Sequence, residues 1–391
     1  ALIVSHPDHL RSLFTAKPEL APSFTSKSPL RPIVGPNSTL TAVGPRHMRQ
    51  RKLLLPSFHG ESIARYIQMI EEAADREIDR WPMGKPFALA PRMQAITLDV
   101  IMSGIFGIEG RPKPGSSEWA LRTAVRVIMD ASTQPLARLE ELVNNGRDTA
   151  LGGTRVAVEA LDRVTHKVIS ERRRAGGLEE RTDIMSMLMQ ARTEDGEALT
   201  DTELRDELLT LVLAGHETTA NSLSWAWERL TRTPEAHDRL IRAVRSGDDA
   251  DTVIEQTVQE VMRTRPVVPA VPRKLSVPWQ FGEYGVPAGT PVGISILLAH
   301  HREDVYVDPF AFRPERWIGN KPGTYTWIPF GGGIRRCLGA SMAMAEIRVV
   351  LKHMAERLDL EADRPEPEHA MHRNVTMIPA RGGRVVARPA S

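Results

Sequence analysis

Residues 330–339 read Phe330-Gly331-Gly332-Gly333-Ile334-Arg335-Arg336-Cys337-Leu338-Gly339 and contain the one cysteine of the 391-residue chain. The glycines permit backbone conformations that other residues avoid and let the chain approach a flat ligand closely. A helix is predicted from Cys337 to about residue 358, so the thiol lies at a helix N-terminus, where the helix dipole and unpaired N–H groups favour thiolate. Arg335 and Arg336 add positive charge. The pattern indicates a reactive thiolate rather than a small buried hydrophobe, the commoner role of a free cysteine.

The composition limits the classes of function. The chain has 51 Lys+Arg against 49 Asp+Glu, a net charge of +2, which argues against a nucleic-acid binder held by bulk positive charge. Apolar residues make up 41% and charged residues 26%, as in an ordinary globular chain. A single cysteine excludes an internal disulfide framework and any multi-cysteine zinc or iron–sulfur site.

The quoted stretch resembles the haem-binding loop of the cytochrome P-450 superfamily, the haem-thiolate monooxygenases, whose pattern is Phe-x-x-Gly-x-Arg-x-Cys-x-Gly. All fixed positions of that pattern are filled, by Phe330, Gly333, Arg335, Cys337 and Gly339. The resemblance implies that Cys337 is the proximal iron ligand of a haem b, whose thiolate favours O–O cleavage. It also implies that Arg335 pairs with a haem propionate and that Phe330 packs beside the sulfur.

A second motif lies in the strongest helix prediction of the chain, residues 200–232. Ala214-Gly215-His216-Glu217-Thr218-Thr219 resembles the family's oxygen-activation motif. Gly215 removes side-chain bulk, and the Thr218 hydroxyl can reach the carbonyl of Ala214 four residues back, so the helix can open or bend there. The resemblance implies that Ala214 and Gly215 lie against the haem and that Glu217 and Thr218 relay protons, a general-acid task.

Three basic residues match the family positions that bind the haem propionates. His47 and Arg51 are four residues apart on a predicted helix, and Arg273 follows a proline-rich segment. Many relatives have Trp where this chain has His47, so its assignment rests on the bacterial form of the motif.

A further pair of motifs is structural. Glu260 and Arg263 match the family's Glu-x-x-Arg, and residues three apart share a helix face. About fifty residues later, residues 312–317 resemble the Pro-Glu-Arg-Phe segment, so Arg316 is expected to join Glu260 and Arg263 in a buried charge cluster. Such a cluster fixes geometry more than it adds stability.

Periodicity predicts a mainly α-helical chain, and the resemblance implies the cytochrome P-450 fold. In that fold a large helical domain carries a small β-rich region, and haem is buried between the long central helix and the cysteine-loop helix. We expect residues 1–391 to form a single haem-thiolate catalytic domain. The remaining helices are predicted at 7–14, 63–80, 92–107, 117–131, 134–175 (with interruptions), 182–191, 251–265 and 293–300. Residues 375–378 and 384–386 suggest a small C-terminal hairpin.

The implied reaction is insertion of one oxygen atom from dioxygen into a lipophilic small molecule, by hydroxylation or epoxidation. A peroxide-driven or isomerase-type haem-thiolate enzyme, a non-catalytic haem sensor and a cysteine-nucleophile hydrolase remain alternatives. The Gly-rich stretch belongs to the cysteine loop, and with no fused reductase segment recognised, electrons are expected from a separate ferredoxin or flavodoxin-like donor with its reductase. Arg335 or Arg336, with Arg348 and Lys352, is expected to contribute to a basic docking face for that donor.

Localisation is an expectation as well. No run approaches the roughly 20 apolar residues that a membrane-spanning helix needs, so a soluble, cytoplasmic protein is expected. The sequence says nothing about oligomeric state, and a monomer is the default expectation. The chain opens on Ala1-Leu2-Ile3-Val4 rather than on methionine, from which we expect further residues upstream that could carry an anchor.

Overall fold

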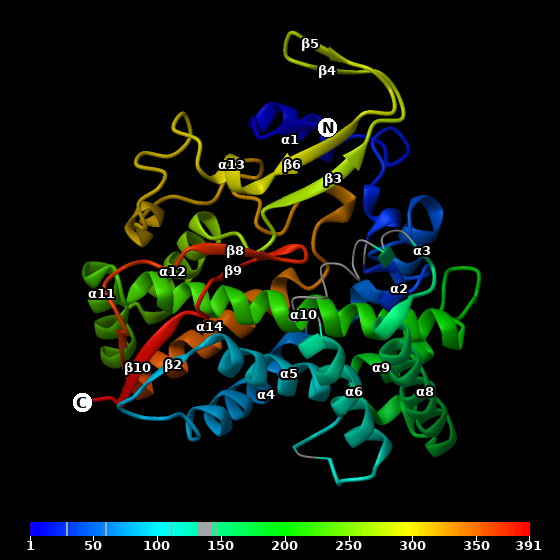
Figure 1. The fold of residues 1–391 in the computed structure, drawn as a ribbon, viewed down its shortest axis with the longest axis horizontal. Coiled ribbons are helices and arrows are strands. Elements are labelled where there is room, and N and C mark those ends of the chain that lie inside the picture. Colours follow the sequence, from blue (N-terminus) through cyan, green and yellow to red (C-terminus); the bar gives the residue numbers. More distant parts are fainter. Residues whose placement is uncertain (29, 59–60, 111, 132–142, 145–146) are drawn as a thin grey trace. The chain divides into compact units, whose positions relative to one another are not determined.

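Helices dominate the structure, a computed structural model that describes residues 1–28, 30–58, 61–110, 112–131, 143–144 and 147–391. The α-helices are α1 Pro7–Phe14, α2 Arg31–Val34, α3 Gly44–Leu54, α4 Glu61–Ile78, α5 Ala90–Phe106, α6 Ser117–Ala131, α8 Gly152–Ala175, α9 Ile184–Gln190, α10 Asp201–Leu230, α11 Pro234–Ser246, α12 Ala250–Thr264, α13 Ile296–His300 and α14 Ala340–Arg357 (Figure 1). Short 3₁₀ turns are η1 Phe24–Lys27, η2 Leu55–Phe58, η3 Leu178–Glu180, η4 Pro314–Trp317 and η5 Gly333–Arg335.

The strands form four small sheets. The strands are β1 Leu2–Val4, β2 Pro86–Ala88, β3 Ala270–Lys274, β4 Trp279–Phe281, β5 Tyr284–Val286, β6 Pro291–Ser295, β7 Leu358–Ala362, β8 Ala370–Arg373, β9 Thr376–Pro379 and β10 Arg384–Pro389. They pair in the orders β1-β6-β3, β2-β10-β7, β4-β5 and β8-β9. Strand β1 runs parallel to β6, and the other pairs are antiparallel.

The chain divides into two compact units. Unit 1 comprises Ala1–Ala21, Ile63–Thr97 and Gly215–Ser391, and unit 2 comprises Pro22–Ser62 and Leu98–Ala214. Unit 1 holds all four sheets and the cysteine loop, and unit 2 holds α3, α6, α8 and α9. Helix α10 contributes residues to both units.

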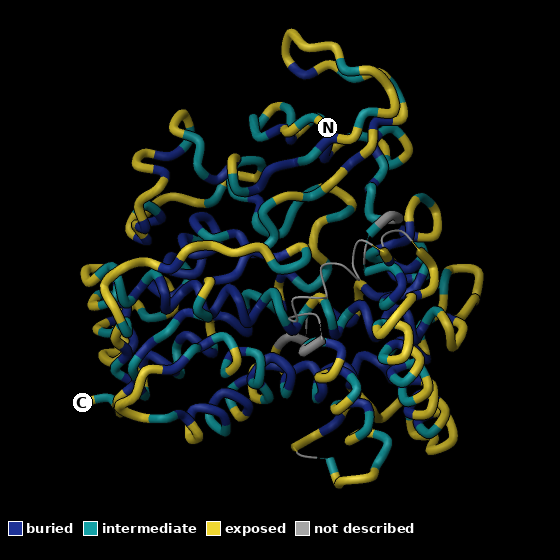
Figure 2. Tube along the Cα trace, in the orientation of Figure 1, coloured by how far each residue is buried: buried dark blue, intermediate teal, exposed yellow. Residues whose placement is uncertain are grey.

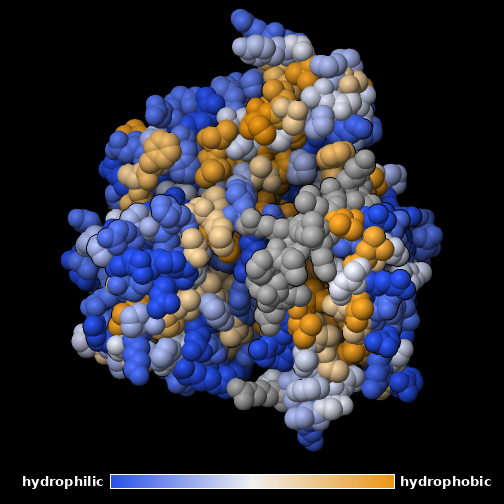
Figure 3. Space-filling view, viewed as in Figure 1, coloured by the Kyte–Doolittle hydropathy of each residue, from blue (hydrophilic) through white to orange (hydrophobic). Residues whose placement is uncertain are grey.

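One core cluster of unit 1 lies between the first sheet and α1. Its buried apolar residues come from β1, α1, β4, β6, α13 and the adjoining loops: Val4, Leu10, Leu13, Phe14, Ala21, Leu275, Phe281, Val292, Ile294, Ile296, Ala299 and Ile328. Hydrophobic residues are also visible at the surface near this sheet in the space-filling view (Figure 3). This cluster matters for the site because Phe14 lies against Gly332 and Gly333 of the cysteine loop, and Ile328 lies two residues before the loop begins.

The N-terminus of α10 has the capping box that its sequence predicts. The backbone N–H of Glu203 donates to Thr200 Oγ1 at 3.2 Å, and the N–H of Thr200 donates to Glu203 Oε2 at 2.9 Å. From Ala220 to Glu228 every residue of the helix is buried (Figure 2). A helix buried on all sides needs little amphipathic pattern, which explains why polar residues such as Asn221 interrupt its apolar face.

Most predicted helices are confirmed to within a few residues, but three expectations need correction. Residues 293–300 are not one helix, because residues 291–295 pair as β6 and only 296–300 turn helical. The C-terminal hairpin is wrong in its pairing: β9 pairs with β8, and β10 joins β2 and β7 instead. Gly382 and Gly383, both at positive φ, turn the chain between β9 and β10. Helix α11, which starts at Pro234 directly after α10, was not anticipated.

One predicted helix lies partly outside the described residues. Of the interrupted helix expected at 134–175, the structure describes α8 from Gly152, and residues 134–142 lie outside the described residues. Within the described residues, no helix combines the length and the apolar character needed to cross a membrane.

Candidate functional site

The cysteine loop leads from η5 into α14. The backbone N–H of Cys337 donates to the carbonyl of Phe330 at 2.9 Å, which closes the loop on itself. Cys337 is exposed, whereas Ala340 three residues later is buried at the start of α14. A thiol that is exposed at the entry to a helix is accessible to a ligand and lies where thiolate is favoured.

The glycines of this loop are required by its surroundings. Gly331 and Gly333 have φ of +67° and +63°, in the left-handed region that glycine adopts without strain. A Cβ atom on Gly332 or Gly333 would collide with the ring or the carbonyl oxygen of Phe14, at the end of α1. The loop is therefore seated directly against α1.

Aromatic residues hold the beginning of the loop. The indole N–H of Trp327 donates to the carbonyl of Gln259 on α12 at 3.0 Å, and its ring meets Phe330 edge-on at 6.2 Å between centroids. The guanidinium of Arg336 lies 5.9 Å from the Phe330 centroid. Phe330 is thus fixed on two sides within the loop.

The expected charge cluster forms beneath this region. Arg263 donates to both carboxylate oxygens of Glu260, at 2.8 and 2.9 Å, and both side chains are fully buried. Arg316 donates to Glu260 at 3.0 Å, and the indole of Trp317 donates to it at 3.2 Å. A buried carboxylate with this many donors is locked in one geometry.

Sequence reasoning missed the part that His300 plays. His300 is fully buried, and its Nε2 accepts the backbone N–H of Ile328 at 2.7 Å while Nδ1 lies 3.2 Å from the carbonyl of Arg263. Burial lowers the pKa of His300 to about 3, so the ring is neutral, with the proton on Nδ1. The family resemblance singles out His301 of this adjacent pair, as a structural residue, whereas the structure gives the link between Ile328 and Arg263 to His300.

Arg273 provides a test of whether the residues fit an anionic cofactor. Its residue exposure is 6%, and burial lowers its pKa to about 10. Its one side-chain hydrogen bond is to the neighbouring Pro272 carbonyl, and within the described part of the chain no carboxylate lies within ion-pairing distance. A buried cation without a counter-charge is costly, so the position suits an anionic ligand group such as a propionate.

The other predicted propionate residues are distributed over both units. Arg335 is half-buried in η5 of unit 1. His47 and Arg51 lie one helical turn apart on α3 of unit 2, where His47 is buried and Arg51 half-buried. Their neighbour Arg49 donates to Glu203 at 2.9 Å and so ties α3 to the start of α10.

Helix α10 opens its surface at the second motif. Ala214 is exposed, and Gly215, Glu217 and Thr218 are half-buried, in the middle of a helix that is otherwise largely buried. His216 points into the protein instead: it is 5% exposed, and burial lowers its pKa to about 4. The motif therefore presents small and hydrogen-bonding side chains on one face, which suits a helix that passes over a flat ligand.

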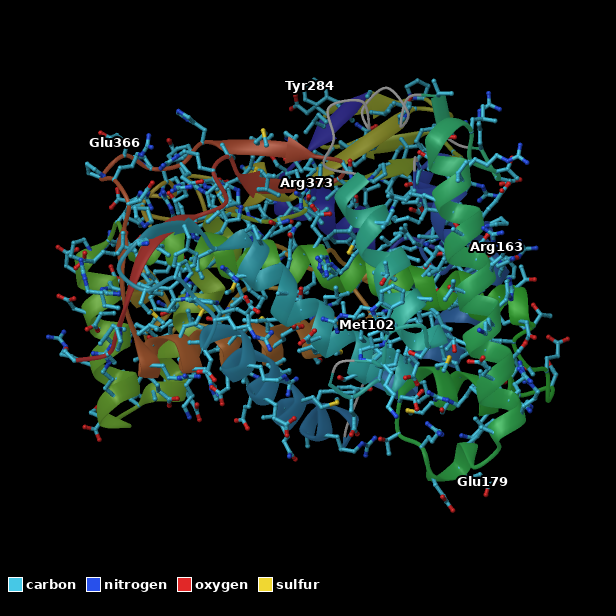
Figure 4. The ribbon with its side chains drawn as sticks, turned by 60° about the horizontal axis from the view of Figure 1, so that its bottom comes forward. Met102, Arg163, Glu179, Tyr284, Glu366 and Arg373 are labelled. Atoms are coloured by element: carbon cyan, nitrogen blue, oxygen red, sulfur yellow. The ribbon has the colours of Figure 1, made fainter. Side chains whose placement is uncertain are left out.

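Glu217 has a partner that no local sequence pattern indicates. Arg373, at the end of β8, donates through Nε to Glu217 Oε1, and its Nη2 forms an ion pair with the same oxygen. The two residues are separated by 156 positions, so spacing alone had no means of pairing them. Figure 4 labels Arg373 at this position in the structure.

Together these residues fit a haem. The thiol of Cys337 offers an iron ligand, Arg273 offers a buried cation with no carboxylate at ion-pairing distance among the residues that the structure describes, and Gly215 removes bulk from α10. Among the described residues, no group of three or more His, Cys, Asp or Glu side chains could hold a metal ion directly. A porphyrin whose iron takes one thiolate needs no such group.

Comparison with known proteins shows which family this chain resembles. A family model described as Cytochrome P-450 matches residues 1–386. The chain is 36% identical over 394 residues to a Mycobacterium tuberculosis protein with the provisional name cytochrome P-450 137, covering 99% of this chain and 80% of the relative. It is 37% identical over 395 residues to a protein provisionally named cytochrome P-450 135B1 of Mycobacterium bovis, covering 98% of this chain and 81% of the relative.

Two solved structures share the fold. A cyanobacterial CYP120A1 with retinoic acid bound superposes with a TM-score of 0.84 at 23% identity, covering 99% of this chain and 89% of that one. The haem domain of a cytochrome P-450DA superposes with a TM-score of 0.80 at 22% identity, covering 100% and 88%. At these identities the likeness concerns the fold alone.

Proposed function

This chain belongs to the cytochrome P-450 family of haem-dependent monooxygenases, and we propose that it inserts one atom of dioxygen into a lipophilic small molecule by hydroxylation or epoxidation. The observation that carries the proposal is the Cys337 thiol, exposed in a loop that is seated on α1 and closed by the Cys337–Phe330 hydrogen bond. We further propose haem b as the cofactor.

The chain's own residues would hold that cofactor. Haem supplies the oxygen chemistry when bound, and the Cys337 thiolate would ligate its iron and donate electron density to it. Arg273 and Arg335 would bind propionates, with His47 and Arg51 as the further candidates from α3. Pairing Arg273 with a propionate would relieve the cost of a cation that is buried without a carboxylate.

Glu217 and Thr218 would deliver protons on the α10 side. A carboxylate can take a proton from water and pass it to a hydroxyl, and a hydroxyl both accepts and donates. Both side chains are half-buried, so each has access to water as well as to the site. The Thr218 carbonyl also accepts a hydrogen bond from the Ser222 hydroxyl at 3.0 Å. A side-chain bond of this kind to the carbonyl four residues back slightly destabilises a helix and often bends it.

Four segments are proposed to contact the substrate: the loop before His47, residues 211–214, residues 267–271 and the Thr376–Met377 tip. Two of these touch each other, because the N–H of Met377 donates to the carbonyl of Val267 at 2.7 Å. Val267 and Met377 are both buried apolar residues, which favours a lipophilic substrate. The solved cyanobacterial structure, which is named with retinoic acid bound, is consistent with that class.

The experiment that tests the activity uses isotope-labelled dioxygen. The purified holoenzyme is first screened with lipids, steroids and terpenoids for a shift of the haem spectrum. Positive compounds are then turned over with a ferredoxin and its reductase. Product that carries one labelled oxygen atom supports the proposal. Product that forms only with added peroxide, product without labelled oxygen, or spectral binding without turnover supports a peroxide-driven enzyme, an isomerase or a sensor instead.

The electron donor is proposed to bind a basic face near Arg336, Arg348 and Lys352. Arg336 is exposed, while Arg348 already pairs with Glu255 at 2.9 Å and Lys352 lies 3.9 Å from Glu356. Arg336 therefore has the larger share of uncompensated charge. R336E is expected to slow ferredoxin-supported turnover at low salt, with the difference shrinking as salt rises. Equal rates for R336E and wild type at low salt would count against this face.

A further inference from the structure

The ion pair between Glu217 and Arg373 connects α10 to the β8-β9 hairpin. Both side chains are about four-fifths buried, with relative exposures of 18% and 19%. The Nε–H of Arg373 donates to Oε1 of Glu217, and Nη2 lies within ion-pair distance of the same oxygen. Because only about a fifth of each side chain is exposed, the two charges attract more strongly than an exposed surface pair does, and Glu217 still reaches the solvent.

The hairpin that carries Arg373 is held firmly. Strand β9 is buried at all four positions, its Met377 carbonyl accepts the indole N–H of Trp225 at 3.0 Å, and the Thr376 hydroxyl donates to the Arg373 carbonyl at 2.8 Å. The turn passes through Asn374 at φ of +53°. The backbone of Arg373 is therefore fixed, and its guanidinium reaches Glu217 from a defined place.

The residue beside Glu217 does not share this task. His216 is neutral, because burial and, to a smaller extent, the nearby charge of Arg373 lower its pKa, while the hydrogen bond at Gln94 raises it. The Thr97 hydroxyl donates to the His216 carbonyl at 3.0 Å, which holds the helix backbone at this point. Arg373 is thus the cation that balances Glu217.

We propose that Arg373 is the positioning residue of Glu217, which holds the carboxylate beside Thr218 and couples proton delivery to the hairpin that meets the substrate. This inference rests on the proposed function, since it assigns a partner to the proposed relay. On this proposal the β8-β9 hairpin positions the proton-donating carboxylate and also contacts the substrate.

The proton balance is simple. Glu217 takes one proton from an acid in the solvent, which neutralises the carboxylate and weakens the ion pair. It gives that proton to the Thr218 oxygen as the Thr218 hydroxyl releases its own proton into the site, which regenerates the carboxylate and restores its bond to Arg373. No electron changes place in this cycle, so it requires no redox partner of its own.

The experiment compares R373Q, R373K and E217Q in the haem-loaded enzyme. R373Q is expected to lower product formed per electron consumed by roughly tenfold, which is below the ~100-fold that a positioned acid contributes. It should raise hydrogen peroxide release and the solvent isotope effect, while the carbon monoxide spectrum stays unchanged. R373K should restore part of the coupling, which is the product formed per electron consumed. The R373Q/E217Q double variant should have the same coupling as E217Q alone.

The matched control is R388Q, which removes an arginine from the exposed pair with Glu361 at 2.8 Å in the β2-β10-β7 sheet. Its coupling should equal that of wild type. Wild-type coupling in R373Q, with T218A uncoupled in the same assay, would overturn the Arg373 assignment and leave the relay standing. Wild-type coupling in both R373Q and T218A would remove the relay itself, and with it the role of Arg373.

Discussion

His300 accepts the backbone N–H of Ile328 at 2.7 Å, with its other ring nitrogen 3.2 Å from the carbonyl of Arg263. Arg263 in turn donates to the His300 carbonyl at 2.8 Å. Ile328 lies two residues before Phe330, which begins the cysteine loop. One neutral imidazole therefore links the buried Glu260–Arg263 pair to the segment that positions Cys337.

H300A should loosen the cysteine loop. The substitution leaves a buried N–H on Ile328 without its acceptor and opens a cavity, which we expect to cost about 2–4 kcal/mol of unfolding free energy. The carbon monoxide complex should contain a larger fraction without the red-shifted Soret band. H300N, which keeps a hydrogen-bonding side chain, should recover part of that band.

The adjacent histidine is the control for that variant. His301 lies 2.8 Å from the Leu297 carbonyl and packs on Phe310, away from Ile328. H301A should leave the Soret band unaltered even if it lowers the melting temperature. An equal loss of the red-shifted band in both variants would mean that His300 has no special role in the loop.

R273Q should weaken haem retention. The guanidinium is buried without a carboxylate partner, and the proposed propionate is its counter-charge. Because the apoprotein carries the cost of that unpaired cation, R273Q is expected to be as stable as wild type, or more stable, when haem is absent. Haem transfer to apomyoglobin should be faster from R273Q by roughly tenfold or more, as expected for a charge-assisted bond worth about 1.5–3 kcal/mol. Equal transfer rates would contradict the assignment.

T218A should separate oxygen consumption from product formation. The hydroxyl is the proposed last donor before the reacting oxygen, so its removal should leave haem binding and the carbon monoxide spectrum intact. The ratio of hydrogen peroxide released to product formed should rise by about 10- to 100-fold. T219A is the control, since Thr219 is the next residue of α10 and is buried. Full coupling in T218A would count against the relay.

Glu346 on α14 gives the folded chain a defined pH dependence. It is buried, its Oε1 has no hydrogen-bond partner within the described part of the chain, and burial raises its pKa to about 8. Between its ordinary pKa of 4.5 and about 8, the folded chain keeps a proton that the unfolded chain has released. The free energy of unfolding therefore falls as pH rises through this window, by at most about 1.4 kcal/mol per pH unit from this group.

E346Q should remove that contribution. Urea unfolding measured from about pH 5 to about pH 9 should show a flatter profile for E346Q than for wild type. E356Q, which changes an exposed residue of the same helix, should keep the wild-type slope. Parallel profiles for wild type and E346Q would show that Glu346 does not titrate in this range.

The parts of the fold that the sequence could predict are those with a local signal. The α10 boundaries follow from the Thr200–Glu203 capping box and Pro234, and the Glu260–Arg263 contact follows from helical spacing. The pairing of β10 with β2 and β7, in place of β9, was not predictable in this way, because strand pairing is set by residues far apart in the chain.

The same distinction holds for the candidate site. Cys337, Arg335 and the Glu217–Thr218 motif were read from short patterns, and their catalytic roles stay predictions. Arg373 and His300 act through contacts across 156 and 28 positions, and neither carries a local pattern that sets it apart from the other arginines and histidines. Only the tertiary structure brings these residues to their partners.

The central claim is that Cys337 ligates a haem iron as a thiolate, and one spectrum tests it most directly. The purified protein is reduced, exposed to carbon monoxide and recorded beside C337S prepared in the same way. The account predicts a strongly red-shifted Soret band for the wild-type chain and its loss in C337S. A colourless wild-type protein, or a red-shifted band that persists in C337S, would contradict it.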